Sequence, residues 1–393
     1  MDNIQNQICE LKNELIELRR DFHMFPELGF QEFETAKKVG TYFESIGLKP
    51  ERVAKTGVTA LLDSEKQGPC LMLRADMDAL PITEKNKVSY KSKNDGIMHA
   101  CGHDAHMAML LVAAKVLTKN KSSFHGTIKF VFQPNEEIAG AVKMIEEGVL
   151  ENPKVNAAMA IHIWSLIPSG RVSITPGVVM GGLDVFKMKI KGRGGHTGYP
   201  HEAIDPVITA ADIIQNVQSI QTRETNAQKP VIIMFGMING GKKANIIPEE
   251  VELEGTIRFL HAPDPDSQKN PTKEFIRICK SICKTHQCSC DIEIEHENIP
   301  LINDADMVTL AKNTAADVFG TPDIIDHARY IASEDFSEFS SIVPGVFIFL
   351  GCADGEKLNN FPHHNPKFNI DENVLTKGVE LHVKAALNYL VPK

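Results

Sequence analysis

The chain has 393 residues, 42 basic and 51 acidic side chains, and a formal net charge of −9. At about 150 residues per domain this length predicts two or three domains, and 42% hydrophobic with 24% charged residues excludes wholesale disorder. The acidic balance argues against a nucleic-acid partner, and the longest apolar run, near 346–350, is far short of the roughly 20 residues that span a membrane.

The first 180 residues alternate between helical and extended hydrophobic patterns. An apolar stripe from Ile4 to Leu18 recurs every three or four residues, which predicts a helix. The same reading predicts helices at 32–46, 104–118 and 137–149, and strands at 71–75, 127–132 and 157–163. Alternating strands and helices indicate an α/β sheet covered on both faces.

The pattern changes near residue 181. Residues 185–191 alternate apolar and basic side chains, as a strand with one solvated face does. After it we predict a helix at 206–221, strands at 231–239 and 250–260, a helix at 272–284 and a strand at 290–295. This β-α-β-β-α-β order is ferredoxin-like. We therefore predict a separate α+β domain over 181–295.

The inserted domain divides the α/β domain into two segments, 1–180 and 296–393. The second segment is predicted to contain a helix at 305–317, a strand at 346–350 and a helix at 373–390. The predicted fold is therefore a two-domain α/β protein with an inserted ferredoxin-like domain. No internal repeat or low-complexity tract interrupts this organisation.

Polar side chains follow several of the predicted strands. They are Asp76 and Asp78 after 71–75, Glu136 and Glu137 after 127–132, His162 at the end of 157–163, and His363 and His364 after 346–350. Open α/β sheets place their sites at the carboxyl ends of strands. We therefore expect these side chains to gather at one edge of the sheet.

Cys101 and His103 are separated by a single glycine, and a thiolate with an imidazole suits a borderline-soft divalent ion. Glu137, His162 and His364 would complete a set of sulfur, nitrogen and oxygen donors. Five donors exceed one tetrahedral site, so they suit two metal ions with an open position for water.

Glu136 and Glu137 are adjacent, so one can bind metal while the other faces water. We expect Glu137 to be a ligand and Glu136 to be the general base that moves a proton to the leaving amine. The alternative is that the two acids only open a helix, where negative charge is favourable. Taken one at a time, each histidine is better explained by a surface or structural role and Cys101 by a small buried thiol. Only the five donors together, at one edge of the sheet, favour a metal site.

A group of four cysteines with one histidine, near residues 279–290, superficially resembles a zinc knuckle. Its members are Cys279, Cys283, His286, Cys288 and Cys290. The spacing matches no paired Cys-x-x-Cys signature, and helix and strand periodicity account for it by packing. The eight scattered cysteines and the polar, acidic start predict a cytoplasmic protein without a disulfide framework.

Four motifs together resemble the M20 metallopeptidase clan. They are Arg74-Ala-Asp-Met-Asp-Ala-Leu-Pro81, Met98-His-Ala-Cys-Gly-His-Asp104, Gln133-Pro-Asn-Glu-Glu137 and Gly194-Gly-His196. The chain is most similar to the amidohydrolase branch of hippurate hydrolases, N-acyl-amino-acid deacylases and indole-acetyl-amino-acid hydrolases. The match runs from about residue 15 to 390, and Asn135 replaces the commoner small residue of its motif.

The resemblance implies a mixed-sheet catalytic domain that holds two divalent metal ions, and an inserted lid domain that also dimerises. It assigns the metal ligands to Cys101, His103, Glu137, His162 and His364. It makes Glu136 the base and Asp78 the acid that orients the metal site. His364 is chosen over His363 because the family pattern is His-x-Pro-x-Phe. In the lid, His196 would stabilise the oxyanion in the partner subunit's site, and Asn245 and Arg258 would bind substrate.

The function implied is hydrolysis of N-acyl amino acids to a carboxylic acid and a free amino acid, by water activated at zinc or manganese. The expected partners are the small-molecule substrate and a second copy of the chain, without nucleic acid or membrane. A dipeptidase or aminopeptidase of the same clan is the nearest alternative. A cysteine hydrolase using Cys101 and His103 would need an alignment that one intervening residue disfavours, and a non-catalytic relative would not require the Glu136–Glu137 pair.

Overall fold

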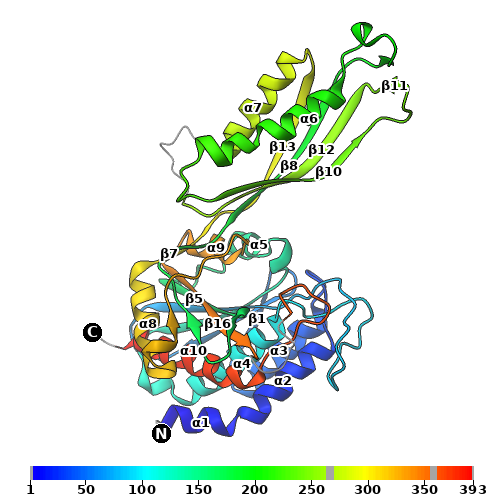
Figure 1. The fold of residues 1–393 in the computed structure, drawn as a ribbon. Helices are drawn as coiled ribbons and strands as arrows, with labels where there is room; N and C mark the ends of the chain where they lie inside the picture. The colour runs from blue at the N-terminus through cyan, green and yellow to red at the C-terminus, as the bar shows by residue number, and fades with distance from the viewer. Residues whose placement is uncertain (1–2, 263–269, 355–360, 392–393) are drawn as a thin grey trace. The chain divides into compact units, whose positions relative to one another are not determined.

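The computed structural model describes residues 3–262, 270–354 and 361–391, and the chain divides into two compact units (Figure 1). Unit 1 comprises Met1–Val179, Ile302–Arg329 and Asp335–Lys393, and unit 2 comprises Met180–Leu301 and Tyr330–Glu334. Each unit has its own cluster of buried apolar side chains. The roles predicted for the two domains, catalysis and lid or dimerisation, stay predictions.

Unit 1 is built on an eight-stranded mixed sheet. Its strands, in spatial order, are β1 (Pro50–Val53), β2 (Gly57–Asp63), β4 (Thr127–Gln133), β3 (Cys70–Asp76), β5 (Ala157–Pro168), β16 (Gly345–Ala353), β6 (Val172–Ser173) and β15 (Ile324–Ile325). The four central strands β4, β3, β5 and β16 run parallel, whereas β1, β2 and β6 pair antiparallel. The predicted mixed-sheet α/β fold class is confirmed.

Helices cover both faces of this sheet. They are α1 (Asn3–Glu10), α2 (Lys12–Met24), α3 (Phe33–Ser45), α4 (His103–Lys119), α5 (Ala141–Glu146), α8 (Ala305–Phe319), α9 (Phe336–Ser340) and α10 (Leu375–Leu390). Helix α4 contacts β3 and β5 and is itself covered by α2 and α10, while α5 and α9 lie on the opposite side (Figure 1). Helix α4 is apolar around most of its circumference, and such helices are buried in a core.

Unit 2 has the ferredoxin-like order. Its elements are β8 (Gly182–Lys191), β9 (Gly195–His196), α6 (Pro206–Asn216), β10 (Val231–Gly240), β11 (Ile246–Ile247), β12 (Glu250–Phe259), α7 (Pro271–Thr285) and β13 (Ser289–Asn298). The antiparallel sheet has the order β10-β12-β8-β13, and β9 pairs with β11 separately. Strands β7 (Gly177–Met180) and β14 (Leu301–Asn303) span points where the chain passes between the units.

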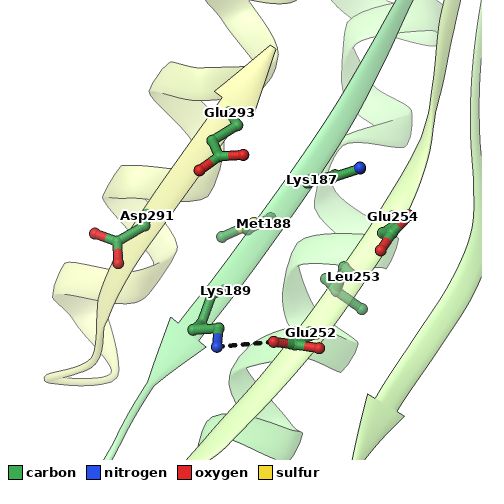
Figure 2. A pocket seen from close by; sticks show the side chains of 8 residues that line it. All are labelled: Lys187, Met188, Lys189, Glu252, Leu253, Glu254, Asp291 and Glu293. Atoms are coloured by element: carbon green, nitrogen blue, oxygen red, sulfur yellow. Dashed lines mark ion pairs between the residues drawn. The ribbon is translucent and has the colours of Figure 1, made fainter. Parts of the chain in front are cut away.

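The solvated face of the unit 2 sheet carries charges of both signs (Figure 2). Lys187 is exposed while Met188 is buried, which confirms the predicted alternation along β8. On this face Lys189 Nζ lies 2.8 Å from a carboxyl oxygen of Glu252 on β12. Opposite charges that pair across strands stabilise a solvated sheet face, so this surface needs no ligand to account for it.

Three local predictions are corrected by the structure. The stripe from Ile4 to Leu18 forms two helices that meet at Leu11. The helix predicted at 137–149 is only α5, preceded by the 3₁₀ turn η2 (Glu136–Ile138). Strand β5 continues past His162 to Pro168, because its apolar run keeps pairing with β16. Among the described residues, every helix is too short or too polar to serve as a transmembrane span.

Candidate metal centre and active site

The segment before α4 brings Cys101 and His103 to the end of the central strands. Gly102 between them has φ +92°, a left-handed conformation that side-chain-bearing residues rarely adopt. A Cβ at this position would lie 2.3 Å from Cδ1 of Ile163 on β5. The glycine is therefore required both for the turn and for the close approach of the segment to the sheet.

His103 is oriented by Asp78. Its Nδ1 lies 2.9 Å from the main-chain oxygen of Asp78, which makes Nδ1 the protonated nitrogen. The buried Nε2 has no hydrogen-bond partner in the described structure. It lies 3.9 Å from Glu136 Oε2 and 4.0 Å from Glu137 Oε1. A buried imidazole nitrogen that points at carboxylates without a partner is the arrangement expected of a metal ligand.

The charges around His103 favour a cation. Burial lowers the pKa of His103, but the surrounding carboxylates, led by Asp76 and Asp78, outweigh burial and raise the pKa to about 10. His103 is therefore protonated at neutral pH in the absence of metal. A divalent ion would replace that proton, because metal ligation requires a neutral imidazole.

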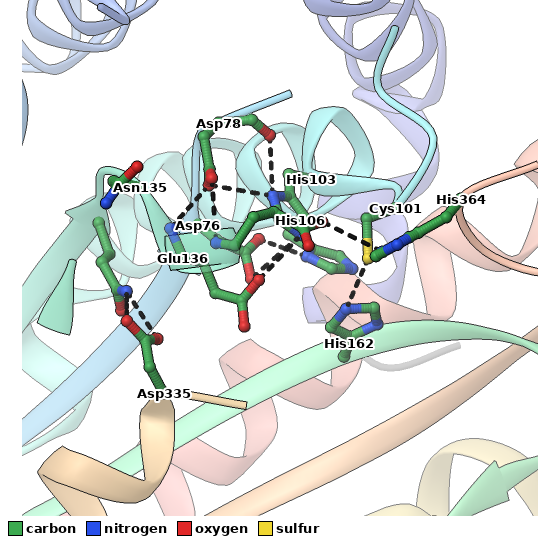
Figure 3. A network of polar contacts seen from close by, with 12 residues as sticks. Asp76, Asp78, Cys101, His103, His106, Asn135, Glu136, His162, Asp335 and His364 are labelled. Carbon is green, nitrogen blue, oxygen red and sulfur yellow. Dashed lines mark hydrogen bonds and ion pairs between the residues drawn. The ribbon is translucent and has the colours of Figure 1, made fainter. Parts of the chain in front are cut away.

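Glu136 and Glu137 are presented by a turn rather than by a regular helix. Both follow β4, and η2 begins at Glu136. Asp78 holds this turn: its Oδ1 accepts a hydrogen bond from Glu136 N at 3.0 Å, and its Oδ2 accepts one from Glu137 N at 3.1 Å (Figure 3). A three-residue 3₁₀ turn does not carry the dipole of a long helix. The alternative that the two acids are present only to stabilise the start of a helix is therefore disfavoured.

His162 reaches the same centre from the middle of β5. Its Nδ1 lies 2.6 Å from the main-chain oxygen of Ile163, and its Nε2 lies 3.6 Å from Cys101 Sγ. Burial holds the pKa of His162 well below its usual value. The ring is therefore neutral, with an unprotonated Nε2 that faces the thiol, as a ligand requires.

His364 completes the cluster from the loop after β16. Its Nε2 lies 3.3 Å from Glu137 Oε1, and one ligand atom each of Cys101, Glu137 and His364 lies within 4.8 Å of the others (Figure 3). Neighbouring His363 points elsewhere: its Nε2 accepts a hydrogen bond from Ser165 N at 3.2 Å, and burial lowers its pKa to about 3. Of the two histidines, only His364 faces the carboxylate.

The structure thus brings together the five residues that the sequence singled out as ligands. Together with the predicted base Glu136, four of them form two overlapping groups, which are His103, Glu136 and Glu137, and Cys101, Glu137 and His364. The fifth, His162, lies beside Cys101. Glu137 belongs to both groups, and its buried Oε1 has no hydrogen-bond partner in the described structure. A carboxylate shared between two sets of sulfur, nitrogen and oxygen donors fits a pair of divalent ions.

His106 and Asp76 lie in the same cluster but differ from the ligands. Asp76, His103, His106 and His162 also bring one ligand atom each within 4.8 Å of one another. His106 Nδ1 lies 2.6 Å from Asp76 Oδ1, and its Nε2 accepts a hydrogen bond from Ile163 N at 2.9 Å. Since both ring nitrogens are occupied, His106 supports the cluster without a lone pair for metal. Its place in the chain gave no signal of this role.

The residues assigned to the inserted domain lie in unit 2. His196 is on β9, opposite Ile246 of β11, and the main-chain oxygen of Asn245 accepts a hydrogen bond from Thr197 N at 3.3 Å. His196 Nδ1 accepts a hydrogen bond from Gly198 N at 3.0 Å. In the neutral ring the proton is therefore on the exposed Nε2. Arg258 is on β12 and is half-buried.

The cysteines near the end of α7 are packing residues. Cys279 and Cys283 are buried in the core of unit 2, and Cys288 Sγ lies 3.2 Å from Thr209 Oγ1. His286 Nε2 instead lies 2.7 Å from Asp212. Within the described residues, no three of these side chains come close enough to share an ion. The discounted zinc knuckle therefore receives no support from the geometry.

Comparison with known proteins places the chain among metal-dependent hydrolases. Residues 72–388 match the family described as peptidase family M20/M25/M40. Thermostable carboxypeptidase 2 of Saccharolobus solfataricus is 35% identical over 396 residues, which cover 99% of this chain and 98% of that protein. N-acetyl-L-cysteine deacetylase of Bacillus subtilis is 38% identical over 373 residues, covering 94% and 87%. A Bacillus subtilis structure described as a dinuclear metal-binding peptidase of the M20 family is 31% identical, with a TM-score of 0.85 and coverage of 97% and 98%.

Proposed function

The chain belongs to peptidase family M20/M25/M40, and on that premise we propose that it hydrolyses the amide bond of N-acyl amino acids. The proposal rests chiefly on one observation. Asp78 holds the main chain of Glu136 and Glu137 so that both acids face the cluster of Cys101, His103 and His364. A carboxylate beside two sets of metal donors is an arrangement that can activate water for amide hydrolysis.

We assign the metal ligands to Cys101, His103, Glu137, His162 and His364. Two divalent ions, zinc or manganese, would supply Lewis-acid polarisation of the amide carbonyl and lower the pKa of water. Glu137 belongs to both groups of donors, and Asp78 would keep His103 in the tautomer that binds. The sulfur and nitrogen donors favour zinc, while the carboxylates are also compatible with manganese.

Glu136 is the general base of the proposed reaction. It lies next to the shared ligand in the chain, and its Oε2 lies 3.9 Å from His103 Nε2. Glu136 takes a proton from the attacking water and then gives that proton to the amide nitrogen of the departing amino acid. With this added proton, the nitrogen takes the electrons of the C–N bond and leaves as a neutral amine rather than as an amide anion.

Unit 2 supplies the proposed substrate contacts. His196 donates from Nε2 to the oxyanion, because its Nδ1 is occupied by the amide of Gly198. Asn245 contributes an amide, and Arg258 pairs with the substrate carboxylate through two parallel hydrogen bonds. Burial lowers the pKa of Arg258, but a guanidinium remains charged at neutral pH. We propose that His196 acts in the site of a partner subunit, with unit 2 as lid and dimerisation domain.

The other proposed properties follow from the same reading. The partners are a small-molecule N-acyl amino acid and a second copy of the chain, with no nucleic acid or membrane. We place the protein in the cytoplasm.

Carboxypeptidase activity is the second candidate, because a relative named thermostable carboxypeptidase is 35% identical over 99% of the chain. Both reactions release an amino acid whose carboxylate is free, so both would use the same recognition by Arg258. A dipeptidase or aminopeptidase would instead require recognition of a free amino group.

A hydrolysis screen separates these activities. Acetyl-, succinyl-, benzoyl- and indole-acetyl-amino acids would be compared with blocked peptides and free dipeptides, each with added zinc or manganese. Fastest release from the N-acyl amino acids supports the proposal, and fastest release from free dipeptides contradicts it. The Glu136→Gln variant serves as the blank for contaminating activity.

A further inference from the structure

One carboxylate holds both ends of the segment that carries the proposed base. The segment runs from Gln133 to Ala141, and the carboxylate belongs to Asp335, which precedes α9. At one end Gln133 Nε2 donates to the Asp335 oxygens at 2.7 and 2.8 Å. At the other end Ala141 N donates to Asp335 Oδ2 at 2.9 Å. Asp335 is completely buried, so these contacts are shielded from water.

Two further carboxylates hold the middle of the same segment. Glu32 Oε1 accepts a hydrogen bond from Asn135 N at 2.9 Å, and Asp78 accepts those from Glu136 N and Glu137 N. Glu32 is itself fixed by Thr56, whose Oγ1 donates at 2.6 Å. We call Glu32, Asp78 and Asp335 the carboxylate clamp. Its members are far apart in the chain and all accept main-chain N–H groups of the segment.

The segment needs such external support because its backbone is not regular. Asn135 has φ 55° and Ala139 has φ 69°, both in the left-handed region. A left-handed alanine is unfavourable on its own and persists only where its surroundings determine the conformation. These two residues flank Glu136 and Glu137. Loss of the clamp would therefore allow the backbone under both acids to relax.

Arg74 compensates the buried charge of Asp335 and links it to the metal cluster. Its Nη2 lies 3.1 Å from Asp335 Oδ1, and its Nε donates to Gln133 Oε1 at 2.8 Å. Its Nη1 lies 2.6 Å from Asp76 Oδ2. Asp76 in turn holds His106. The base-bearing segment and the support of the metal cluster thus share one buried guanidinium.

We propose that Asp335 is a positioning residue, which sets the backbone of residues 133–141 so that Glu136 faces the substrate water. The inference rests on the proposed function, in which Glu136 is the base. One carboxyl oxygen of Asp335 lies within 4.8 Å of one of Glu136. Asp335 holds the segment through the main-chain N–H of Ala141 and the side chain of Gln133, and Arg74 balances its charge.

Asp335→Asn is a sharp test because it preserves the shape of the side chain. Both carboxylate oxygens accept hydrogen bonds, so an amide nitrogen at either position would face an N–H donor. One end of the segment would lose its support. A displacement near 1 Å at the reacting group can cost about 100-fold in rate. We expect kcat to fall about 10- to 100-fold, with KM within about two-fold and metal content unchanged, because Gln133, Ala141 and Arg74, which Asp335 holds, are neither assigned ligands nor proposed substrate contacts.

A second measurement does not depend on activity. In metal-free protein, amide hydrogen exchange should become faster across residues 134–141 in Asp335→Asn and remain unchanged in α8. The matched control is Asp304→Asn. Asp304 also accepts two main-chain N–H groups, those of Asp306 and Met307, but caps α8 away from the segment. It should leave kcat and exchange across 134–141 as in the wild type.

Exchanging the carboxylate and the amide between residues 133 and 335 should restore the activity lost in Asp335→Asn. Gln133→Glu alone would set two carboxylates face to face and should also lower kcat. Combined with Asp335→Asn it restores a donor–acceptor pair, because the new amide can donate to the new carboxylate, which still accepts from Arg74 Nε. The double variant should recover most of the lost kcat and slow the exchange again.

The outcomes are distinct. Slow turnover with fast exchange in Asp335→Asn and recovery in the double variant support the inference. Wild-type kcat or unchanged exchange in Asp335→Asn overturns it. If Asp335→Asn unfolds or loses metal, the double variant provides the test. Recovery of kcat in the double variant then supports the inference, and no recovery contradicts it. If the wild-type protein hydrolyses no N-acyl amino acid, the proposed function is wrong. The role of Asp335 in holding the segment is then tested by amide hydrogen exchange alone.

Discussion

Asp78 contacts His103 twice, through its main-chain oxygen at 2.9 Å and through Oδ1 at 3.3 Å from the same Nδ1. Both contacts hold one proton on Nδ1, so a metal ion that replaces the proton on Nε2 would bind the nitrogen that faces the carboxylates. The same Asp78 side chain holds the main chain of Glu136 and Glu137. One acid therefore sets the direction of a proposed ligand and the position of the proposed base.

Asp78→Ala is expected to lower the affinity for the tighter metal by about 10- to 100-fold, the usual cost of losing support for a metal-binding histidine. A chelator competition on the folded protein measures this affinity. Asp63→Asn, at an exposed end of β2, is the control. Unchanged affinity in Asp78→Ala would contradict the role given to Asp78.

Glu136→Gln is expected to reduce kcat by about 100- to 10,000-fold, the range of a lost general base. Metal content should stay at the wild-type level, because the assigned ligands remain. Turnover and metal content would be measured on the same preparation, with Glu146→Gln on α5 as an exposed control. Turnover near the wild-type rate would show that another group moves the proton.

Cys101→Ala is expected to lower metal content after dialysis, because it removes the thiolate that faces His162 and lies beside His364. The matched control is the double change of Cys288 and Cys290 to serine, which removes two thiols of unit 2. Elemental analysis per chain gives the comparison. A lost ion in the control, rather than in Cys101→Ala, would revive the zinc-knuckle interpretation.

His196→Ala and Glu136→Gln should each be nearly inactive, whereas a refolded mixture should regain activity if His196 serves the partner subunit's site. Random pairing would leave about a quarter of the sites complete in a symmetric dimer. The measurement is turnover of the mixture against each variant alone. No regain in a mixture shown by mass to contain hybrid dimers would place His196 in its own subunit's site.

The stability of unit 1 is expected to fall as pH rises above the ordinary histidine pKa. Burial and Arg19 lower the pKa of His23, but Asp104 and Glu84 outweigh them and raise it above 6.5. A raised folded-state pKa adds stability that is complete below the unfolded value and is lost as pH rises through the folded value.

His23→Gln should therefore remove the part of this dependence that His23 contributes. Breaking a buried ion pair costs ~3 kcal/mol, so the variant should be less stable at pH 6 and should approach the wild type at higher pH. The fluorescence of Trp164, the single tryptophan, reports the denaturant unfolding of unit 1. A stability difference that is constant from pH 6 to pH 9 would contradict the assignment.

Most of the element order could be predicted because the apolar residues that a helix or strand buries recur along the sequence at the spacing of that element. Strand β3 and helix α4 were predicted within one residue at each end, since their apolar patterns are long and uninterrupted. The helix predicted at 137–149 was too long. Its first residues are helix-compatible in sequence, but Asp78 and Asp335 bind their main-chain N–H groups and hold a turn instead.

The sequence by itself determined the element order, the family motifs and the donor residues, because these depend on side-chain type and spacing along the chain. Only the tertiary structure decided that His106 uses both nitrogens for support, that His363 turns to Ser165, and that Glu32 and Asp335 hold the segment with the base. These relationships are hydrogen bonds to the main chain or between distant segments. Every residue except proline has a main-chain N–H group, so the partner of that group leaves no local pattern in the sequence.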